Sequence, residues 1–551
     1  MYSMAKKFRP LLLLFLLLIS CNNNKETASD TTNPQRVSVP TQHNNNTRSG
    51  WNNQETLLTT ENVNPQQFGK LFSLAVDDQI YAQPLVVGNI FINNSLHNVA
   101  YVATVNNTLY AYDGDTGKLY WKKNFTAPGM RPPRNTDMTG ACGGNYRDFS
   151  GKMGIVGTPV IDEHMQTIYF VARSTSNGNF VQYLHAVNLI SGNEVSGSPV
   201  KITATYEGSG TGSVNNEITF DAQRQNQRQA LTLVNGIVYV TFSSHCDWGP
   251  YHGWILGYNA STLQQQIVYN DTPNGFAGGI WESGGGMSAD EQGNLYVVTG
   301  NGTVGNNGDP ANLTNRGESA LKLFPSGSTL KIETFFTPYD YMNLNNHDFD
   351  YGSLGALLIP HSNYYFTGGK KGKLYLLDKN NMGGFQSSAN QVQQTIQLGS
   401  NAKMHAQAAY FKGNANEFVY IWSENEPLRA YPFNRSTNML DQSNQIVSNV
   451  SGPSGESGAV LSVSSNGSED GTGILWASYA SSGNAEHEVS PGILRAFDAQ
   501  DITKELWNNH QNFDRDGAGN YAKFSSPTIV NGHVYLPTFS GRVVVYGLLD
   551  Q

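Results

Sequence analysis

The stretch VAYVATVNNTLYAYDGDTGKLYWKK, residues 99–123, carries the pattern from which the fold can be predicted. Apolar and polar residues alternate at period two in two short runs, which is typical of β-strands. Asn106 and Asn107 lie between the runs and favour a tight hairpin, and residues 113–117 (DGDTG) are a second turn signal before a run with Trp121. The stretch therefore predicts an antiparallel meander.

Seven further stretches repeat this pattern, which gives eight units of about 60 residues, against ~40–50 for a compact propeller blade. Examples are GTPVIDEHMQTIYFVARS from residue 157, ALTLVNGIVYVTFSSH from residue 230 and PTIVNGHVYLPTFSGRVVVYGL at 527–548. Short strands that recur with turn signals between them are typical of β-propellers. We predict an all-β fold with a single eight-bladed β-propeller over residues 68–551, and seven blades are the alternative.

The last unit stops after its third strand, so its blade lacks an outer strand. The segment GKLFSLAVD, residues 69–77, precedes the first unit and has outer-strand character. Pairing this segment with the last unit would remove two sheet edges and close the ring. We therefore expect the propeller to be closed by an N-terminal strand.

Several units also resemble a known family. The stretches LYAYDGDTGKLYWKK (109–123), GTPVID (157–162), HGWILGYNASTL (252–263) and GKLYLLDKNNMG (372–383) look like PQQ-type repeats, the pyrroloquinoline-quinone enzyme repeats of quinoprotein alcohol dehydrogenase-like β-propellers. The resemblance covers nearly all of residues 70–548. It implies the fold and not a cofactor, because the repeat is a fold signature.

The N-terminus resembles a lipoprotein signal peptide over residues 1–20. A basic stretch, KKFR at residues 6–9, precedes an apolar run too short to cross a bilayer, and residues 18–21 (LISC) resemble a bacterial lipobox. We predict cleavage before Cys21, acylation of Cys21 and a flexible polar tether over residues 21–67. An ordinary signal peptide followed by a chance Cys is the alternative.

The residue after Cys21 bears on the location of the protein. Asn22 is not the Asp that retains lipoproteins in the inner membrane of well-studied Gram-negative bacteria. This resemblance favours an outer-membrane lipoprotein of a Gram-negative bacterium, with the folded body in the periplasm or at the cell surface.

Composition excludes two classes of protein. The formal net charge is −9, so the chain lacks the basic surface that a nucleic-acid binder needs. A hydrophobic content of 38% and an aromatic content of 11% are too high for a disordered chain.

Residues just before the innermost strands should meet at one face of the central channel. The candidate ligand-binding residues of this face are Gln83, Thr158, Arg228, Trp281, Glu282, Asp350, His405, Glu456 and Lys523. The plainer interpretation is that they bond to each other and to channel waters. Beside them, Trp248, Tyr251 and Trp254 form a candidate aromatic platform.

The resemblance leaves PQQ and Ca²⁺ open as cofactors. Alcohol-oxidising relatives hold the quinone between two adjacent cysteines and a Trp, with calcium bound by Glu, Asn and Asp. After Cys21 the chain contains only Cys142 and Cys246, so the adjacent pair is absent, and no CxxCH haem motif occurs. No catalytic residue and no metal site can be assigned.

Cys142 and Cys246 are expected to form a disulfide. Export would bring them into a compartment where disulfides persist, and both lie in Gly-rich or polar loops. Two separate buried thiols are the alternative.

Three functions remain open. We favour a non-catalytic module that binds a glycan or a partner protein through the channel face. A PQQ- or calcium-dependent periplasmic oxidoreductase of the quinoprotein dehydrogenase type is the second. The third is a scaffold in outer-membrane protein assembly, a comparison that rests on fold and lipid alone.

Overall fold

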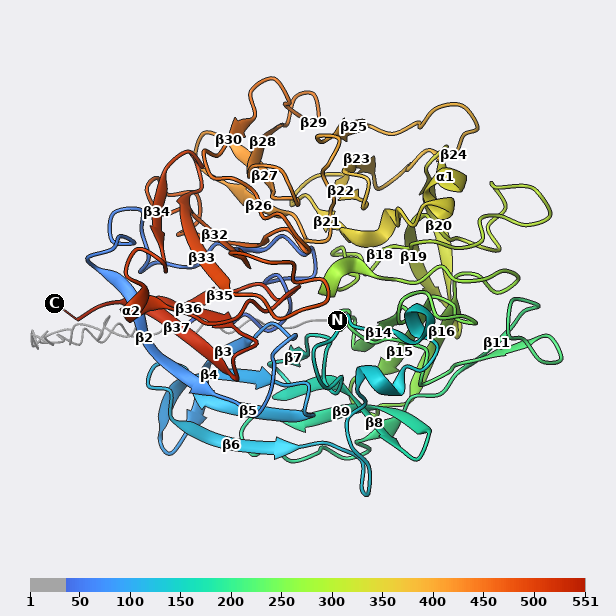
Figure 1. Ribbon diagram of the computed structural model, residues 1–551, viewed down its shortest axis with the longest axis horizontal. Coiled ribbons are helices and arrows are strands. Elements are labelled where there is room, and N and C mark those ends of the chain that lie inside the picture. The colour runs from blue at the N-terminus through green and yellow to red at the C-terminus, as the bar shows by residue number, and fades with distance from the viewer. Residues whose placement is uncertain (1–35, 551) are drawn as a thin grey trace, which may run out of the picture. The chain divides into compact units, whose positions relative to one another are not determined.

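The computed structural model describes residues 36–550. Its strands lie close to the positions that the sequence repeats predict. Residues 37–550 belong to one compact unit, in which eight antiparallel sheets surround a central channel (Figure 1). Four strands follow one another outward from the channel in each sheet. The predicted eight-bladed β-propeller is therefore confirmed. The predicted signal peptide, residues 1–20, and Cys21 lie outside the described residues.

The first four blades follow the chain in order. Blade 1 consists of β3 (Leu85–Ile92), β4 (Ser95–Ala103), β5 (Thr108–Asp113) and β6 (Leu119–Asn124). Blade 2 consists of β7 (Val160–Asp162), β8 (Thr167–Ser176), β9 (Asn179–Asn188) and β10 (Val200–Lys201). Blade 3 consists of β13 (Thr232–Val234), β14 (Ile237–Phe242), β15 (Trp254–Asn259) and β16 (Gln265–Asn270). Blade 4 consists of β17 (Ser288–Ala289), β18 (Leu295–Val298), β19 (Ala320–Ser326) and β20 (Thr329–Thr337).

The other four blades complete the ring. Blade 5 consists of β21 (Leu357–Leu358), β22 (Tyr364–Gly368), β23 (Lys373–Asp378) and β25 (Gln394–Gln397). Blade 6 consists of β26 (Ala409–Lys412), β27 (Glu417–Ile421), β28 (Arg429–Asn434) and the short β29 (Met439–Leu440) and β30 (Ile446–Val447). Blade 7 consists of β31 (Val460–Ser464), β32 (Ile474–Ala480), β33 (Gly492–Asp498) and β34 (Glu505–Asn508). Blade 8 consists of β35 (Thr528–Val530), β36 (His533–Pro537), β37 (Arg542–Leu548) and β2 (Phe68–Ala75).

Short elements lie at the edges of blades and in connections. The strands are β1 (Trp51–Asn52), parallel to β31, β24 (Gly384–Phe385), parallel to β20, and the separate hairpin of β11 (Thr205–Glu207) and β12 (Glu217–Thr219). The helices are α1 (Tyr341–Asn346), α2 (Phe513–Asp516) and the 3-10 turns η1 (Asn135–Asp137), η2 (Ala141–Gly144), η3 (Glu282–Gly284) and η4 (Tyr351–Ser353). Over residues 36–550, no helix is long and apolar enough to cross a membrane.

The middle strands are buried on both faces because each blade lies between two others. Every residue of β5 and of β32 is buried, although only alternate residues would be buried in a sheet with one wet face. Apolar side chains of adjacent blades interdigitate around the whole ring, for example Val238 of blade 3 with Tyr169 of blade 2. Each fully buried aliphatic side chain contributes ~1.5–3 kcal/mol relative to exposure.

The ring is closed by the N-terminal strand, as predicted. β2 pairs antiparallel with β37, from Phe68 opposite Leu548 to Ala75 opposite Arg542, and Figure 1 shows the blue strand beside the red one. Val543 and Val545 of blade 8 then pack on Val86 of blade 1. β2 thus supplies the fourth, outer strand of blade 8 and covers the edge of β37.

The predicted flexible tether is wrong for residues 37–67. Residues 37–52, which we call the N-terminal strap, run through the channel and bond to the innermost strand of every blade. The contacts are Val39–Val86, Pro40 O with Ile161 N, Asn46 Nδ2 with Leu233 O, Asn46 O with Ala289 N, Thr47 O with Leu358 N, Ser49 O with Tyr410 N, Gly50 O with Val463 N and Asn52 Nδ2 with Ile529 O. Innermost strands have an unpaired edge, and the polar strap pairs with it.

The strap enters at one particular end of the channel. Val37 donates to Asn531 Oδ1 (2.8 Å) just after β35 ends, and Ser38 donates to Glu163 Oε2 (2.6 Å) just after β7 ends. Farther along, Leu58 and Val63 pack into the core between blades 7 and 8. The strap therefore enters where the innermost strands finish and fills the channel as far as the starts of β13 and β17, where Arg48 donates to Leu231 O and Met287 O.

Candidate functional site

A cavity of about 390 Å³ lies at the opposite end, where the innermost strands begin. It is lined by residues from all eight blades, including Tyr81, Val156, Arg228, Trp281, Asp350, His405, Glu456 and Phe524. We call it the channel-mouth pocket. The repeat creates the pocket, because equivalent positions before each innermost strand converge on the axis.

Six of the nine predicted channel-face residues line this pocket: Arg228, Trp281, Asp350, His405, Glu456 and Lys523. The other three lie deeper and are bonded to protein. Gln83 accepts from His43 N (3.1 Å) and donates to Thr528 Oγ1 (2.9 Å), and Thr158 Oγ1 accepts from Gln83 N (2.9 Å). As ligand-binding candidates, Gln83 and Thr158 are therefore wrong, since the strap and the adjacent blades occupy them.

Glu282 is the third residue that is absent from the pocket lining. Its side chain is fully buried and accepts from Val298 N (3.1 Å). Burial raises the pKa of Glu282 to about 8, although the nearby Arg48 of the strap lowers it. Glu282 belongs to the support beneath the pocket and is a wrong candidate for ligand contact.

Lys370 was missed by the sequence analysis. Its ammonium lies 2.6 Å from Asp350 Oδ2 and 3.2 Å from Asp348 Oδ2. Burial opposes the charge, but the Asp350 and Asp348 carboxylates raise the pKa of Lys370 above its ordinary value. Lys370 lies in the turn after β22, the second strand of its blade. Such turns lie at the end of the blade where the innermost strand begins. The stretch GGKKGK (368–373) was therefore the sequence signal for a basic residue at the pocket.

Asn301 completes this ion cluster. Its backbone N–H donates to Asp350 Oδ1 (2.9 Å) and its side-chain amide donates to Asp348 Oδ1 (2.7 Å). Burial alone would raise the pKa of Asp350, but the Lys370 ammonium lowers it below its ordinary value. Asp350 is therefore ionised, and both carboxylates are paired with the Lys370 ammonium and with donors of Asn301.

Arg228 and Lys523 line another part of the pocket, and both lie over the ring of Phe524. The guanidinium carbon of Arg228 is 4.9 Å from the Phe524 centroid and 5.2 Å from the Trp281 ring. The ammonium of Lys523 is 5.5 Å from the Phe524 centroid. The indole ring of Trp281 is thus covered by an arginine and is no free stacking surface.

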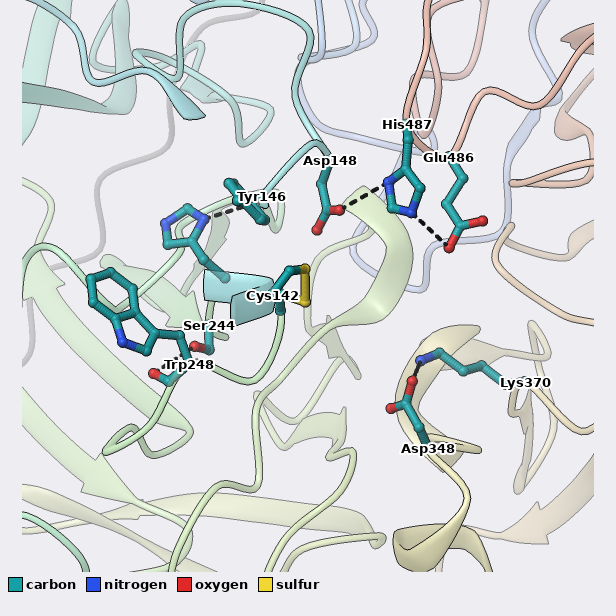
Figure 2. The surroundings of a disulfide bond; sticks show 11 residues. Cys142, Tyr146, Asp148, Ser244, Trp248, Asp348, Lys370, Glu486 and His487 are labelled. Carbon is teal, nitrogen blue, oxygen red and sulfur yellow. Dashed lines mark hydrogen bonds and ion pairs between the residues drawn. A yellow bond between two sulfur atoms is a disulfide. The ribbon is translucent and has the colours of Figure 1, made fainter. Parts of the chain in front are cut away.

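Histidines pair with several acids around the mouth. His405 Nδ1 lies 2.6 Å from Glu424 Oε1. His487 lies between Asp148 and Glu486, at 3.4 Å from each carboxylate (Figure 2). Burial would raise the pKa of Glu456, but His405 and the Lys523 and Arg228 cations lower it, so this carboxylate is ionised.

A disulfide joins Cys142 to Cys246 at the pocket wall, the pair expected from the sequence. The Cα atoms are 5.5 Å apart, and the bond ties η2 to the loop after β14. Figure 2 shows Tyr146 beside it, with its hydroxyl 2.8 Å from His245 Nδ1. The bond fixes two long insertions over the channel.

Left-handed backbone conformations are concentrated at this pocket. The lining residues with positive φ are Cys142 (48°), Cys246 (50°), Asp247 (48°), Asp348 (55°) and Phe524 (66°). Such conformations cost non-glycine residues of order 1 kcal/mol each and are found preferentially at functional sites. The surrounding structure holds these loops in place at the expense of stability.

The predicted aromatic platform is not present as a shared surface. Trp254 is 1% exposed and packs in the core between blades 2 and 3, so this candidate is wrong. Tyr251 is 4% exposed and its hydroxyl bonds to Asp247. Trp248 is half-buried beneath Arg224, whose guanidinium carbon lies 5.1 Å from the ring.

The pocket does not fit calcium-bound PQQ as the alcohol-oxidising relatives hold it. Among residues 36–550, no three His, Cys, Asp or Glu side chains are grouped to hold a metal. Asp348 and Asp350 share the Lys370 ammonium, and the two cysteines belong to different insertions. We derive no chemistry through that cofactor.

Comparisons with known proteins place the fold. A PQQ-repeat family model described as outer membrane protein assembly factor BamB matches residues 84–142. Quinohemoprotein alcohol dehydrogenase from Comamonas testosteroni aligns with a TM-score of 0.55 and 13% identity, over 93% of this chain and 80% of that one. A europium-containing methanol dehydrogenase aligns with a TM-score of 0.57 and 12% identity, over 93% and 98%. A comparison with curated protein sequences finds no match.

At identities this low, structural likeness shows the fold alone. The chain is an eight-bladed β-propeller. The family-model match identifies a PQQ-like repeat over residues 84–142, which contain blade 1, and the structural neighbours share the propeller fold.

Proposed function

We propose that this propeller is a non-catalytic binding module whose channel-mouth pocket receives the end of a glycan. One observation carries the proposal: residues from all eight blades surround a cavity of about 390 Å³, whose lining includes many charged side chains and five strained residues. That volume is at the lower end of the ~300–1,000 Å³ of small-molecule sites. A protein partner would need a larger and flatter surface.

The strap makes the pocket single-ended. Its backbone and the side chains of Asn46 and Asn52 bond to all eight innermost strands beneath the cavity, so a ligand enters and leaves through one mouth. This arrangement supports binding and does not support passage through the channel.

The chemistry of the lining suits a ligand with many hydroxyl groups. Hydroxyls donate and accept hydrogen bonds, and the lining offers the acceptor Glu456 beside the donors Arg228 and Lys523. Phe349 and Tyr81 add apolar surface to the lining. A glycan end meets both demands.

The lipobox resemblance supports the further proposal that Cys21 anchors the protein in the outer membrane. The described chain enters the channel at residue 37, at the end opposite the pocket. An anchor upstream of that point would attach to the closed end, and the pocket would remain accessible.

A paired substitution tests glycan binding. Asp247 lies at the pocket wall with φ of 48°, a conformation that Asn tolerates, so Asp247→Asn replaces the carboxyl group by an amide without new strain. Asp501→Asn, in an outer turn of blade 7, is the matched control. We expect a panel of mono- and disaccharides to raise the melting temperature of the full chain and of Asp501→Asn, and this rise to fall at least twofold in Asp247→Asn. Equal responses, or no saturable response of the wild type, would contradict the proposal.

A further inference from the structure

We propose that Arg228 and Lys523 form an anion subsite in the channel-mouth pocket that binds the carboxylate of an acidic sugar. This inference rests on the proposed glycan function and names the class of sugar. It begins from the position of the two cations, which blades 3 and 8 bring together over one ring, Phe524.

The Arg228 guanidinium contacts two aromatic rings. Its central carbon lies 5.2 Å from the ring centroid of Trp281 and 4.9 Å from that of Phe524. Stacking on aromatic rings holds a guanidinium through its faces and leaves its edge available for hydrogen bonds. The edge is the part that recognises a carboxylate in bidentate fashion.

The terminal nitrogens of Arg228 lack protein acceptors, in contrast to the three fully buried arginines. Arg48 donates through both terminal nitrogens to Thr41, Gln42, Leu231, Thr232 and Met287, and Arg173 donates to Asn226 and His245. Arg316 donates to Thr337, Pro310 and Asn312. Within residues 36–550, the side chain of Arg228 makes one hydrogen bond, from Nε to Trp281 O at 3.4 Å. The terminal nitrogens of Arg228 therefore offer unused hydrogen-bond donors at the channel-mouth pocket.

Lys523 adds a second charge that its surroundings do not neutralise by contact. It is 3% exposed and donates to Glu486 O (2.6 Å), a neutral carbonyl. Burial lowers the pKa of Lys523 and the Arg228 charge lowers it further, although Glu456 and Asp148 oppose this. In the part of the chain that the structure describes, no carboxylate lies within 4 Å of either cation, whereas buried charges are normally paired.

Most acids of the pocket are already matched. Asp348 and Asp350 contact Lys370, and Glu424 contacts His405. An incoming carboxylate therefore meets two cations that contact no carboxylate. Glu456, which is ionised, is the acid that most strongly raises the pKa of Lys523. The hydroxyls of the same sugar can donate to Glu456, which separates the two negative groups by the sugar ring.

The planar guanidinium of Arg228 favours a planar carboxylate. Inorganic phosphate also has negative charge and acceptor oxygens, so it could bind the same cations. The test therefore titrates the full chain by calorimetry with D-galacturonate, D-galactose, acetate and inorganic phosphate. Galacturonate and galactose differ only in the carboxylate. Because charge-assisted hydrogen bonds contribute ~1.5–3 kcal/mol, we expect galacturonate to bind about 10- to 100-fold more tightly than galactose.

Two arginines provide a matched pair of variants. Arg224 and Arg228 both stack on a Trp, at 5.1 and 5.2 Å, but only Arg228 lines the pocket. Arg228→Gln should weaken galacturonate binding at least tenfold and galactose binding by much less, because only galacturonate loses a charge-assisted contact, and Arg224→Gln should change neither. Arg228→Lys keeps the positive charge but lacks the two terminal nitrogens of the guanidinium. Its affinity for galacturonate should therefore lie between those of the wild type and of Arg228→Gln. Melting curves of each variant show that it is folded.

The outcomes separate this inference from the function on which it rests. Equal binding of galactose and galacturonate, or equal weakening of both by Arg228→Gln, would overturn the anion subsite while glycan binding stands. Phosphate or acetate binding that depends on Arg228, without galacturonate binding, would overturn the assignment to a sugar. Failure of every sugar would overturn both proposals.

Discussion

The same eight blades line two parts of the central channel, and these parts differ in how their polar groups are satisfied. In the part that the strap fills, which we call the closed end because the strap blocks the channel there, Arg48 is fully buried and makes five hydrogen bonds to protein acceptors. At the open end, Arg228 makes one, and its terminal nitrogens remain unused. We infer that the closed end contributes stability, whereas the open end holds polar groups ready for a ligand at a cost in stability.

The backbone follows the same division. Five non-glycine residues with left-handed conformations line the open end, whereas the strap uses its backbone to complete the edges of the innermost strands. A ring of repeats needs only one closed end to be stable, so the other end can accept strained loops. The following predictions test this division from the largest expected effect to the smallest.

The largest effect should come from Arg48→Met. Removing the guanidinium leaves buried acceptors such as Thr232 Oγ1 and Leu231 O without a donor, and the loss of one partner from such a buried network costs ~3–5 kcal/mol. Urea unfolding of the full chain measures this loss. Arg228→Met is the control at the open end and should change the free energy of unfolding by less than ~1 kcal/mol. Similar losses in both variants would contradict the division.

A pH dependence should come next, through His43 of the strap. Burial lowers the pKa of His43 to about 4, whereas its ordinary value is 6.5. Between these values the unfolded chain binds a proton and the folded chain does not. The contribution of His43 is therefore fully present above pH 6.5 and is lost as the pH falls towards 4, by up to ~3 kcal/mol.

His43→Asn isolates this contribution, because Asn tolerates the φ of 53° at this position. Denaturant unfolding at pH 7, 5.5 and 4.5 should show the wild type losing stability faster than the variant. Parallel curves for the two proteins would mean that His43 is protonated in the folded state and that the closed end is wetter than its burial indicates.

Much of this arrangement could be predicted from the sequence, for a physical reason. Periodic strands fix the blades, and the repeat then places residues before each innermost strand at the axis, so six pocket residues were found. Gln83 and Thr158 failed because each lies one step farther into the channel, where adjacent blades and the strap meet. The depth at which each of these residues lies in the channel is decided by packing, which the repeat pattern does not encode.

The strap could not be predicted by the same means. Its polar composition is typical of a tether, and its partners are distant in sequence, as for Val37 and Asn531. A strand pattern records burial of apolar side chains, whereas the strap is held mainly through backbone atoms and polar side chains. The signal for Lys370 was present, but it lies in a different turn at the same end of the blade.

The smallest effect should come from Lys523→Met at the open end. Burial lowers the pKa of Lys523, which means that the folded protein holds this charge less favourably than water does. Met has a similar length and places an apolar group over Phe524, so the variant should be as stable as the wild type or up to ~1 kcal/mol more stable. Thermal unfolding at pH 7 measures the change, with Lys504→Met, an exposed lysine of blade 7, as the control for losing a positive charge. A loss above ~2 kcal/mol would show that Lys523 holds the ring together, and the open end would then be a second stabilising element.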